Sequence, residues 1–398
     1  MPTHSRVLLA LALVVAALGA ACAPSDSAAP PPGSGGVSGG SGSGGLSGGS
    51  GGTGGAQAGT GGRDAGAPPD AATGSGGATD AAGVDATADQ PPPRPLAANA
   101  ATSCKCELKF SPIQADPAAG KSTSDTHAGD QQSMKVDVTK PLQGKLAIVF
   151  GGIGGGPGPG GIYGYAVSKG FHAFMVATQT AISSAPDMYK NQSTPEANRQ
   201  VGDARMEAWD GVDRVSWLDV KPPDSVVNRT QAALKRAMTL DPGGDWGFFL
   251  NADGTVRWTD VVLVGYSFGA QTISMVSKYV RVSRVCATSG PASENFPSAE
   301  WITHPSATPV ERLYMMVGGD APYPPASGNV GDKIDTTTAA GWLGPPINVK
   351  PGDAGPFGDA HQIVLVGSAP GAPGGHSEFC AGDGGGWRAI CDHFLGVK

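Results

Sequence analysis

The stretch that decides the fold is Val261–Gly269, which reads VVLVGYSFG. Its uninterrupted apolar beginning is typical of a strand buried on both faces of a parallel sheet. The residues that follow, AQTISMVSKYV, have helical character. The G-x-S-x-G pattern between them is the strand-turn-helix arrangement in which a strained serine is exposed, and glycines two residues away on either side prevent collisions of Cβ atoms. The sequence therefore predicts Ser267 as a nucleophile.

The five-residue pattern alone is a weak signal, because the chain contains three further matches. They are centred on Ser38, Ser47 and Ser50, and none of them follows an apolar run or begins a helix. The surroundings of Ser267 therefore carry the prediction.

The composition of the chain divides it into three parts. From about residue 30 to residue 100 it consists largely of Gly, Ser, Ala, Pro and Asp and has no aromatic residue, so this tract cannot bury a core. We expect a leader at 1–22, a disordered linker at 23–103 and one catalytic domain at 104–398. The net charge of −7 and the absence of a basic run argue against nucleic acid as a partner.

The beginning of the chain is typical of an exported protein. Val7–Leu18 is an apolar run too short to span a bilayer, and it follows a short basic segment. The small residues before Cys22 resemble the lipobox of bacterial lipoproteins, although Gly19 stands where that pattern usually has Leu. This resemblance implies lipidation of Cys22, with ordinary signal-peptide cleavage as the alternative. Because Ala23 rather than Asp follows, it favours the outer membrane.

The domain alternates short apolar runs with longer helical stretches, which predicts a predominantly parallel sheet with helices on both faces. An antiparallel strand at Ser133–Thr139 is expected to precede the parallel set, and Asp224 is expected to cap the helix that Pro242 ends. The other expected strands are Lys145–Phe150, Phe171–Ala177, Val261–Tyr266, Ser283–Thr288, Arg312–Val317 and His361–Gly367. The expected helices are Gly161–Lys169, Asn198–Trp209, Asp224–Leu240, Phe268–Tyr279 and Gly386–Leu395.

With these motifs, residues 145–398 resemble the α/β-hydrolase family, in particular its bacterial secreted esterases and lipase-like members. The stretch VRWTDVVLVGYSFGAQT also resembles a small subgroup of bacterial hydrolases. The resemblance implies an acid after the seventh strand and a general base after the eighth. Asp320 follows RLYMMVGG directly, and His376 ends the Gly/Pro-rich loop after HQIVLVG. Asp332 and Asp335 are competing acids, which we interpret as solvated loop charges.

These assignments imply a mechanism and an oxyanion hole. His376 takes the proton of Ser267, and Asp320 orients the imidazole. The Phe268 amide is one expected oxyanion donor. The other comes from the loop GGIGGG at 151–156, with Ile153 preferred by analogy and Gly152 as the alternative. No cofactor motif and no metal-site spacing is present.

The cysteines agree with export. Five remain after Cys22, and we favour a disulfide between Cys380 and Cys391, which bracket a short Gly-rich stretch. Cys286 lies in an apolar run and is interpreted as a small buried hydrophobic residue. The remaining two are Cys104 and Cys106.

The function favoured is hydrolysis of an ester outside the cytoplasm, on a small-molecule, glycan or lipid ester, by a monomer whose only membrane contact is its lipid anchor. A serine peptidase, an acyltransferase and a non-catalytic surface binding module remain alternatives. His127 is kept as a substrate contact. Aromatic residues that could line a pocket or pack in the core are Trp209, Trp217, Tyr323 and Trp342.

Overall fold

The computed structural model describes residues 101–102, 107–152, 158, 160–178, 195–291, 300–319, 329–367, 380 and 385–397. The chain divides into two units, Met1–Pro93 and Arg94–Lys398. The first unit lies wholly outside the described residues, and so do the expected leader, Cys22 and nearly all of the expected linker. Among the described helices, none has the length and apolar character needed to cross a membrane.

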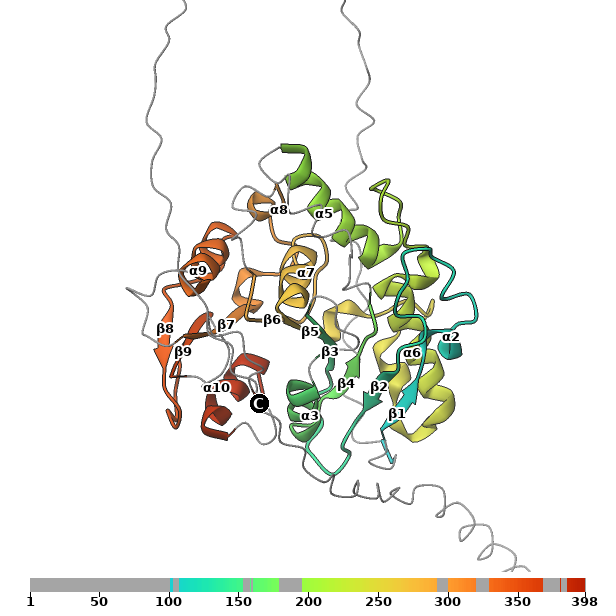
Figure 1. The fold of residues 1–398 in the computed structure, drawn as a ribbon. Coiled ribbons are helices and arrows are strands. Elements are labelled where there is room, and N and C mark those ends of the chain that lie inside the picture. Colours follow the sequence, from blue (N-terminus) through green and yellow to red (C-terminus); the bar gives the residue numbers. More distant parts are fainter. Residues whose placement is uncertain are drawn as a thin grey trace, which may run out of the picture. The chain divides into compact units, whose positions relative to one another are not determined.

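The described part of the second unit is built on a nine-stranded sheet with the order β1-β2-β4-β3-β5-β6-β7-β9-β8 (Figure 1). β2 pairs antiparallel with β1 and with β4, and every other neighbouring pair is parallel. The bounds are β1 Leu108–Phe110, β2 Gln132–Lys135, β3 Leu146–Phe150, β4 His172–Met175, β5 Val261–Tyr266, β6 Arg284–Thr288, β7 Leu313–Gly319, β8 Ile347–Val349 and β9 Gln362–Val366.

Helices cover both faces of this sheet (Figure 1). Successive strand residues point to opposite faces. Thus Ile148 of β3 packs in the same cluster as side chains of α6, α7 and α9, and Val149 packs with side chains of α3 and α10. The helices are α2 Pro112–Ala115, α3 Gly160–Ser168, α5 Pro195–Asp210, α6 Val226–Leu240, α7 Phe268–Val276, α8 Glu300–Thr303, α9 Asn329–Ala339 and α10 Arg388–Leu395.

The structure confirms the predicted strands and helices to within a few residues and adds elements that the sequence did not reveal. β1 and β8 have three residues each, too short for a periodic pattern. α9 carries Asp332 and Asp335, so these are helix residues, and their interpretation as loop charges was wrong. Because β8 precedes it in the chain, the last strand is the ninth and not the eighth, although it pairs directly with β7.

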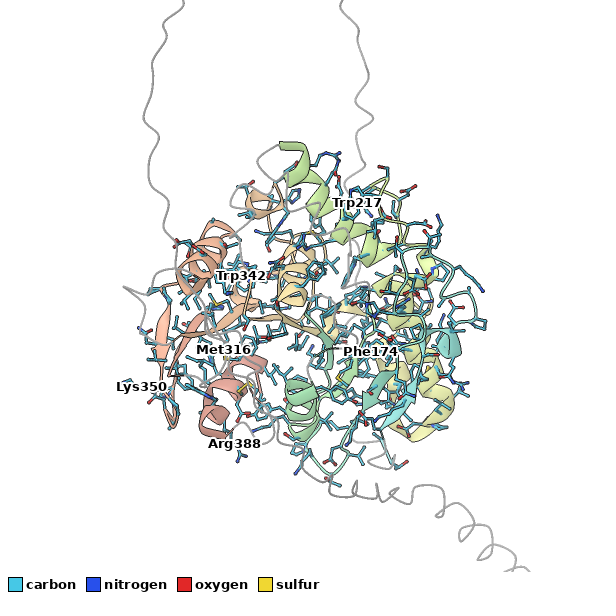
Figure 2. The ribbon with its side chains drawn as sticks, in the orientation of Figure 1. Phe174, Trp217, Met316, Trp342, Lys350 and Arg388 are labelled. Carbon is cyan, nitrogen blue, oxygen red and sulfur yellow. A yellow bond between two sulfur atoms is a disulfide. The ribbon has the colours of Figure 1, made fainter. Side chains whose placement is uncertain are left out.

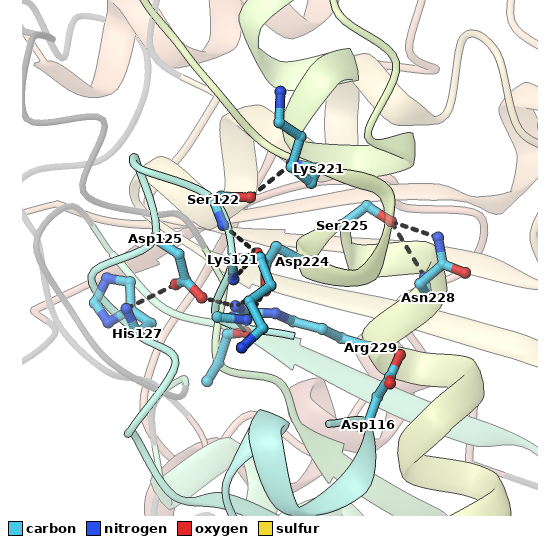
Figure 3. Close-up of polar contacts among 12 residues, drawn as sticks. Asp116, Lys121, Ser122, Asp125, His127, Lys221, Asp224, Ser225, Asn228 and Arg229 are labelled. Carbon is cyan, nitrogen blue, oxygen red and sulfur yellow. Dashed lines mark hydrogen bonds and ion pairs between the residues drawn. The ribbon is translucent and has the colours of Figure 1, made fainter. Parts of the chain in front are cut away.

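The prediction that Asp224 caps α6 was also wrong. Ser225 is the N-cap, and its hydroxyl oxygen accepts a hydrogen bond from the backbone of Asn228. The Asp224 carboxylate is buried and accepts hydrogen bonds from the backbone N–H groups of Gly120, Lys121 and Ser122 (Figure 3). Burial acts to raise its pKa, but these hydrogen bonds and the one from Arg229 outweigh burial and hold the pKa at about 2.

His127 lies in the same polar cluster (Figure 3). Its Nδ1 is 2.6 Å from Asp130 Oδ2, and its backbone N–H donates to Asp125. The guanidinium of Arg229 bonds to Asp125 and also donates to the backbone carbonyl of Ala177, just beyond β4. The cluster therefore ties the segment before β2 to α6 and to the end of β4. A substrate contact for His127 stays a prediction.

His172, at the start of β4, is a buried core histidine. Its Nε2 is 2.7 Å from the carbonyl oxygen of Gly244, and its ring packs edge-on against Trp246 and Phe249. Burial lowers its pKa to about 4, although the hydrogen bond to Gly244 acts to raise it. The folded state therefore resists protonation of this ring.

We expect the His172→Gln variant to lose less stability than the wild type on acidification from pH 7 to pH 4. The unfolded chain binds a proton at His172 below about pH 6.5, whereas the folded chain binds it only near pH 4. Stability therefore falls as pH drops through this window, by about 3 kcal/mol at most for this group. The measurement is urea unfolding at several pH values. Parallel pH curves for the two proteins would contradict the assignment.

Candidate functional site

The turn at Ser267 joins β5 to α7 and has a strained backbone. Ser267 has φ 55° and ψ −115°, a conformation that L-residues rarely adopt and that costs of the order of 1–3 kcal/mol. Its N–H donates to the carbonyl of Thr288 on β6 at 2.9 Å, and its own carbonyl accepts from Gln271 at 3.2 Å. The neighbouring strand and the first turn of the helix therefore both hold the strained residue in place.

The two glycines of the motif occupy positions where no side chain fits. A Cβ on Gly265 would lie 2.5 Å from the carbonyl carbon of Gly269. A Cβ on Gly269 would lie 2.6 Å from the carbonyl oxygen of Gly151, and such contacts require the backbone to move. The sequence argument for the motif therefore has a direct structural counterpart.

We expect Gly269→Ala to destabilise the protein by about 2 kcal/mol or more, because the added methyl group collides with backbone atoms rather than with a flexible side chain. The control is Gly164→Ala on α3, where a Cβ meets no atom within 4 Å. We expect this control to be more stable than the wild type by up to about 1 kcal/mol, because alanine is a better helix former than glycine. Urea unfolding of both variants makes the comparison. Equal stability of the two variants would contradict the packing argument.

The loop after β3 passes beside Ser267. A Cβ on Gly152 would lie 3.4 Å from the ring of Tyr266 and 3.5 Å from the Cβ of Ser267. The second oxyanion donor was predicted in this loop. The loop lies next to the turn at Ser267 because β3, which precedes the loop, is a direct neighbour of β5. Ile153, the preferred donor, lies outside the described residues. The Phe268 amide begins α7, where backbone N–H groups lack intrahelical acceptors.

The expected acid and base also lie outside the described residues, but the strands that lead to them are described. Asp320 is the next residue after β7, and His376 belongs to the segment after β9. β5, β6, β7 and β9 run parallel, so all four end at the same edge of the sheet. The strands β5, β7 and β9, which precede the three residues of the predicted triad, therefore end at the same edge.

Three other histidines are excluded as partners of Ser267 by their positions. His172 pairs with the first residue of β3, and His361 directly precedes β9, so both lie at the opposite edge of the sheet. His361 Nδ1 is 2.9 Å from the carbonyl oxygen of Leu313. His393 Nε2 is 2.8 Å from that of Ala360, also at this edge.

The predicted disulfide is present: Cys380 and Cys391 are joined, with their Cα atoms 5.8 Å apart. Cys391 belongs to α10. The bridge therefore attaches Cys380, which follows His376 in the chain, to this helix. Cys286 is a free and fully buried thiol, and burial raises its pKa to about 12. The interpretation of Cys286 as a small buried hydrophobic residue is therefore confirmed.

Two of the four aromatic residues singled out in the sequence are core residues. Trp209 and Trp342 are buried in the main cluster. Trp217 packs against the smaller cluster around Phe268, beside α5 (Figure 2). Tyr323 lies outside the described residues. Trp217 is thus the described aromatic of this set that packs outside the main core, against the cluster that contains Phe268.

The site also has neighbours that the sequence did not reveal. Arg205 of α5 is buried and contacts Phe268 and Gln271 in the first turn of α7. Ser289 follows Thr288, which pairs with Tyr266, and it has φ 54°. No sequence signal marked either residue, because an arginine in an amphipathic helix is usually solvated and a lone serine fits any loop.

Within the described ranges, no group of three His, Cys, Asp or Glu side chains is arranged to hold a metal ion. A surface cavity of about 340 Å³ is lined partly by Lys145, Ser283 and Arg312. These residues directly precede β3, β6 and β7, so the cavity lies at the edge opposite Ser267. It is therefore separate from the candidate site.

Comparison with known proteins finds no matching family model and no matching curated protein. Solved structures are similar only at a distance. A protein assigned as a carboxylesterase from Lactobacillus plantarum is 10% identical, with 66% of this chain and 85% of that one covered and a TM-score of 0.28. One assigned as a dienelactone hydrolase from Klebsiella pneumoniae is 13% identical, covering 73% and 98%, with a TM-score of 0.28. A feruloyl esterase module from Clostridium thermocellum is 11% identical, covering 77% and 91%, with a TM-score of 0.30.

Similarities at this level do not by themselves determine fold or chemistry. The fold follows from the chain's own topology instead. The parallel centre of the sheet, the helices on both of its faces and the strained serine between β5 and α7 are together those of the α/β-hydrolase fold.

Proposed function

We propose that this chain is a serine hydrolase that cleaves carboxylic esters through an acyl-enzyme. The observation that carries the proposal is the backbone of Ser267, held at positive φ between a buried strand and a helix by glycines that admit no side chain. A serine that only caps a helix needs none of this strain, because a helix N-cap has ordinary extended φ and ψ angles.

In the proposed reaction, the Ser267 hydroxyl attacks the ester carbonyl while His376 accepts its proton. Asp320 holds the imidazole in the required tautomer and stabilises the imidazolium. His376 then gives the proton to the departing alcohol, and water hydrolyses the acyl-enzyme by the reverse sequence of proton transfers.

Charge on the tetrahedral oxygen is stabilised by two backbone donors. One is the Phe268 N–H at the beginning of α7, and the other is in the loop after β3, at Ile153 in our assignment. The closeness of Gly152 to Ser267 supports a donor from this loop, because it brings the backbone of the loop within reach of a bound substrate.

The proposed substrates are small-molecule, glycan or lipid esters outside the cytoplasm. We favour ester hydrolysis over transfer to another acceptor, over peptide cleavage and over a purely binding role. The strained turn supports this choice over a binding role, because an adhesive surface has no use for a strained serine hydroxyl.

We expect a fluorophosphonate probe to label the wild type and not Ser267→Ala, because the probe reacts with an activated serine hydroxyl. Ser274→Ala is the control: this serine lies on the same helix, buried, with its hydroxyl bonded to the carbonyl of Ala270. We expect Ser274→Ala to label like the wild type. Labelling is followed by gel fluorescence, and hydrolysis of p-nitrophenyl esters of graded chain length then defines the acyl preference.

Two results would count against the proposal. Label that persists in Ser267→Ala would place the nucleophile elsewhere. A folded wild type that neither takes up the probe nor hydrolyses any of the esters would favour the binding module instead.

We also propose that the protein is exported and anchored by a lipid on Cys22, with the catalytic domain as a monomer in the cell envelope and the outer membrane as its site. The support is the apolar run before Cys22 and the small residues next to it. A single lipid anchor of this kind needs no transmembrane helix in the domain.

We expect Cys22→Ser, expressed in a bacterial host with an alkyne fatty acid, to lose the lipid label that the wild type acquires, because lipidation requires the thiol. Cys104→Ser, outside the leader, serves as the control and should keep the label. Incorporation is read by click chemistry on a gel. An unlabelled wild type recovered in the soluble periplasmic fraction would instead show ordinary signal-peptide cleavage.

A further inference from the structure

We propose that Arg205 is a positioning residue for the oxyanion hole, acting from α5 on the first turn of the helix that follows the nucleophile. The inference deepens the proposed function and rests on it, because the proposed function assigns the Phe268 N–H as an oxyanion donor.

The guanidinium contacts two residues of that turn. Its Nη2 donates to the side-chain oxygen of Gln271 at 2.6 Å, and its Cζ lies 4.9 Å from the centre of the Phe268 ring. Residues three apart share one face of a helix, so a single side chain spans the first turn of α7. Arg205 is 2% exposed and Phe268 5% exposed, so water competes little for these contacts.

The first turn matters because it joins the proposed nucleophile, Ser267, to the proposed oxyanion donor, the Phe268 N–H. The Gln271 N–H donates to the carbonyl of Ser267 at 3.2 Å, which is the hydrogen bond that begins the helix. The Phe268 N–H has no intrahelical acceptor and is free to serve the substrate oxygen. A tilt of this turn moves the nucleophile and the donor relative to each other, and misplacement by about 1 Å costs on the order of a hundredfold in rate.

The Phe268 ring is held from a second segment as well. It packs with Val215, Leu218 and Val220, which lie between α5 and α6. The buried carboxylate of Glu207 holds this segment, since it accepts hydrogen bonds from the backbone N–H groups of Arg214, Val215 and Val220. α5 therefore fixes Phe268 twice, directly through Arg205 and indirectly through Glu207.

A buried guanidinium is a poor source of net stability, because its desolvation offsets much of what its contacts provide. A flexible apolar side chain of similar length would fill the same space. What the arginine adds is direction, through a planar group that donates along fixed axes and stacks on an aromatic face. We therefore expect its removal to change the rate more than the stability.

The test compares Arg205→Met with Arg199→Met in the full chain. Arg199 lies on the same helix with its side chain half exposed and pairs with Asp203, so it controls for the loss of an arginine from α5. We expect Arg205→Met to lower kcat on a p-nitrophenyl ester about tenfold, with KM changed less than about twofold. The fluorophosphonate labelling rate should fall in parallel, because the adduct oxygen occupies the same hole. Arg199→Met should match the wild type in kcat, KM and labelling.

Further variants separate positioning from folding. Gln271→Met removes the acceptor and should also lower kcat, and the double variant with Arg205→Met should be no slower than the slower single variant, because both act through one turn. Arg205→Lys keeps a donor without the planar face and should recover part of the rate. The thermal midpoint of each variant is measured alongside, and Gln271→Met decides the question if Arg205→Met does not fold.

The outcomes distinguish this inference from the proposed function. A labelled wild type together with unchanged kcat and labelling rate in Arg205→Met or Gln271→Met would overturn the positioning role alone. Strictly additive losses in the double variant would also overturn it. A folded wild type that reacts with neither probe nor ester would overturn both.

Discussion

The close packing of the carboxyl ends of β3 and β5 against the start of α7 is the constraint on which the rest of the site depends. There the backbones of Gly151, Gly265 and Gly269 approach so closely that a single Cβ on either motif glycine would collide with another backbone atom. Close packing of this kind lets the buried sheet hold Ser267 in a conformation that it would not adopt in isolation. The strain is local, and the pairing of β5 with both of its neighbours maintains it.

The two ends of the parallel strands carry different kinds of polar residue. At the amino ends of the strands, buried polar groups have fixed backbone partners, as His172 has in Gly244 and His361 in Leu313. At the carboxyl ends lie the strained serine and the strands that lead to Asp320 and His376. Open α/β sheets place their sites at this edge, because loops there can vary while the strands keep the geometry.

Irregular segments are held to this framework by buried carboxylates. Asp224 accepts hydrogen bonds from three backbone N–H groups in the segment before β2. Glu207 accepts hydrogen bonds from three backbone N–H groups in the segment between α5 and α6. Backbone without regular structure needs such partners when it is buried, and an ionised carboxylate is a strong acceptor for several donors at once. The segment that Glu207 holds packs against Phe268, the residue after Ser267.

The sequence by itself determined the central strands and the turn at Ser267, because these depend on patterns of a few consecutive residues. It also favoured the bridge between Cys380 and Cys391, which lie 11 residues apart. It did not reveal β8, which is too short for a pattern, or the cap at Ser225, where Asp224 was the stronger local signal. Only the tertiary structure decided that Asp224 and Arg205 are buried. Gly120, Lys121 and Ser122 lie about a hundred residues before Asp224, and Gln271 lies 66 residues after Arg205. A buried charge needs hydrogen-bond partners, and here distant segments of the chain supply them.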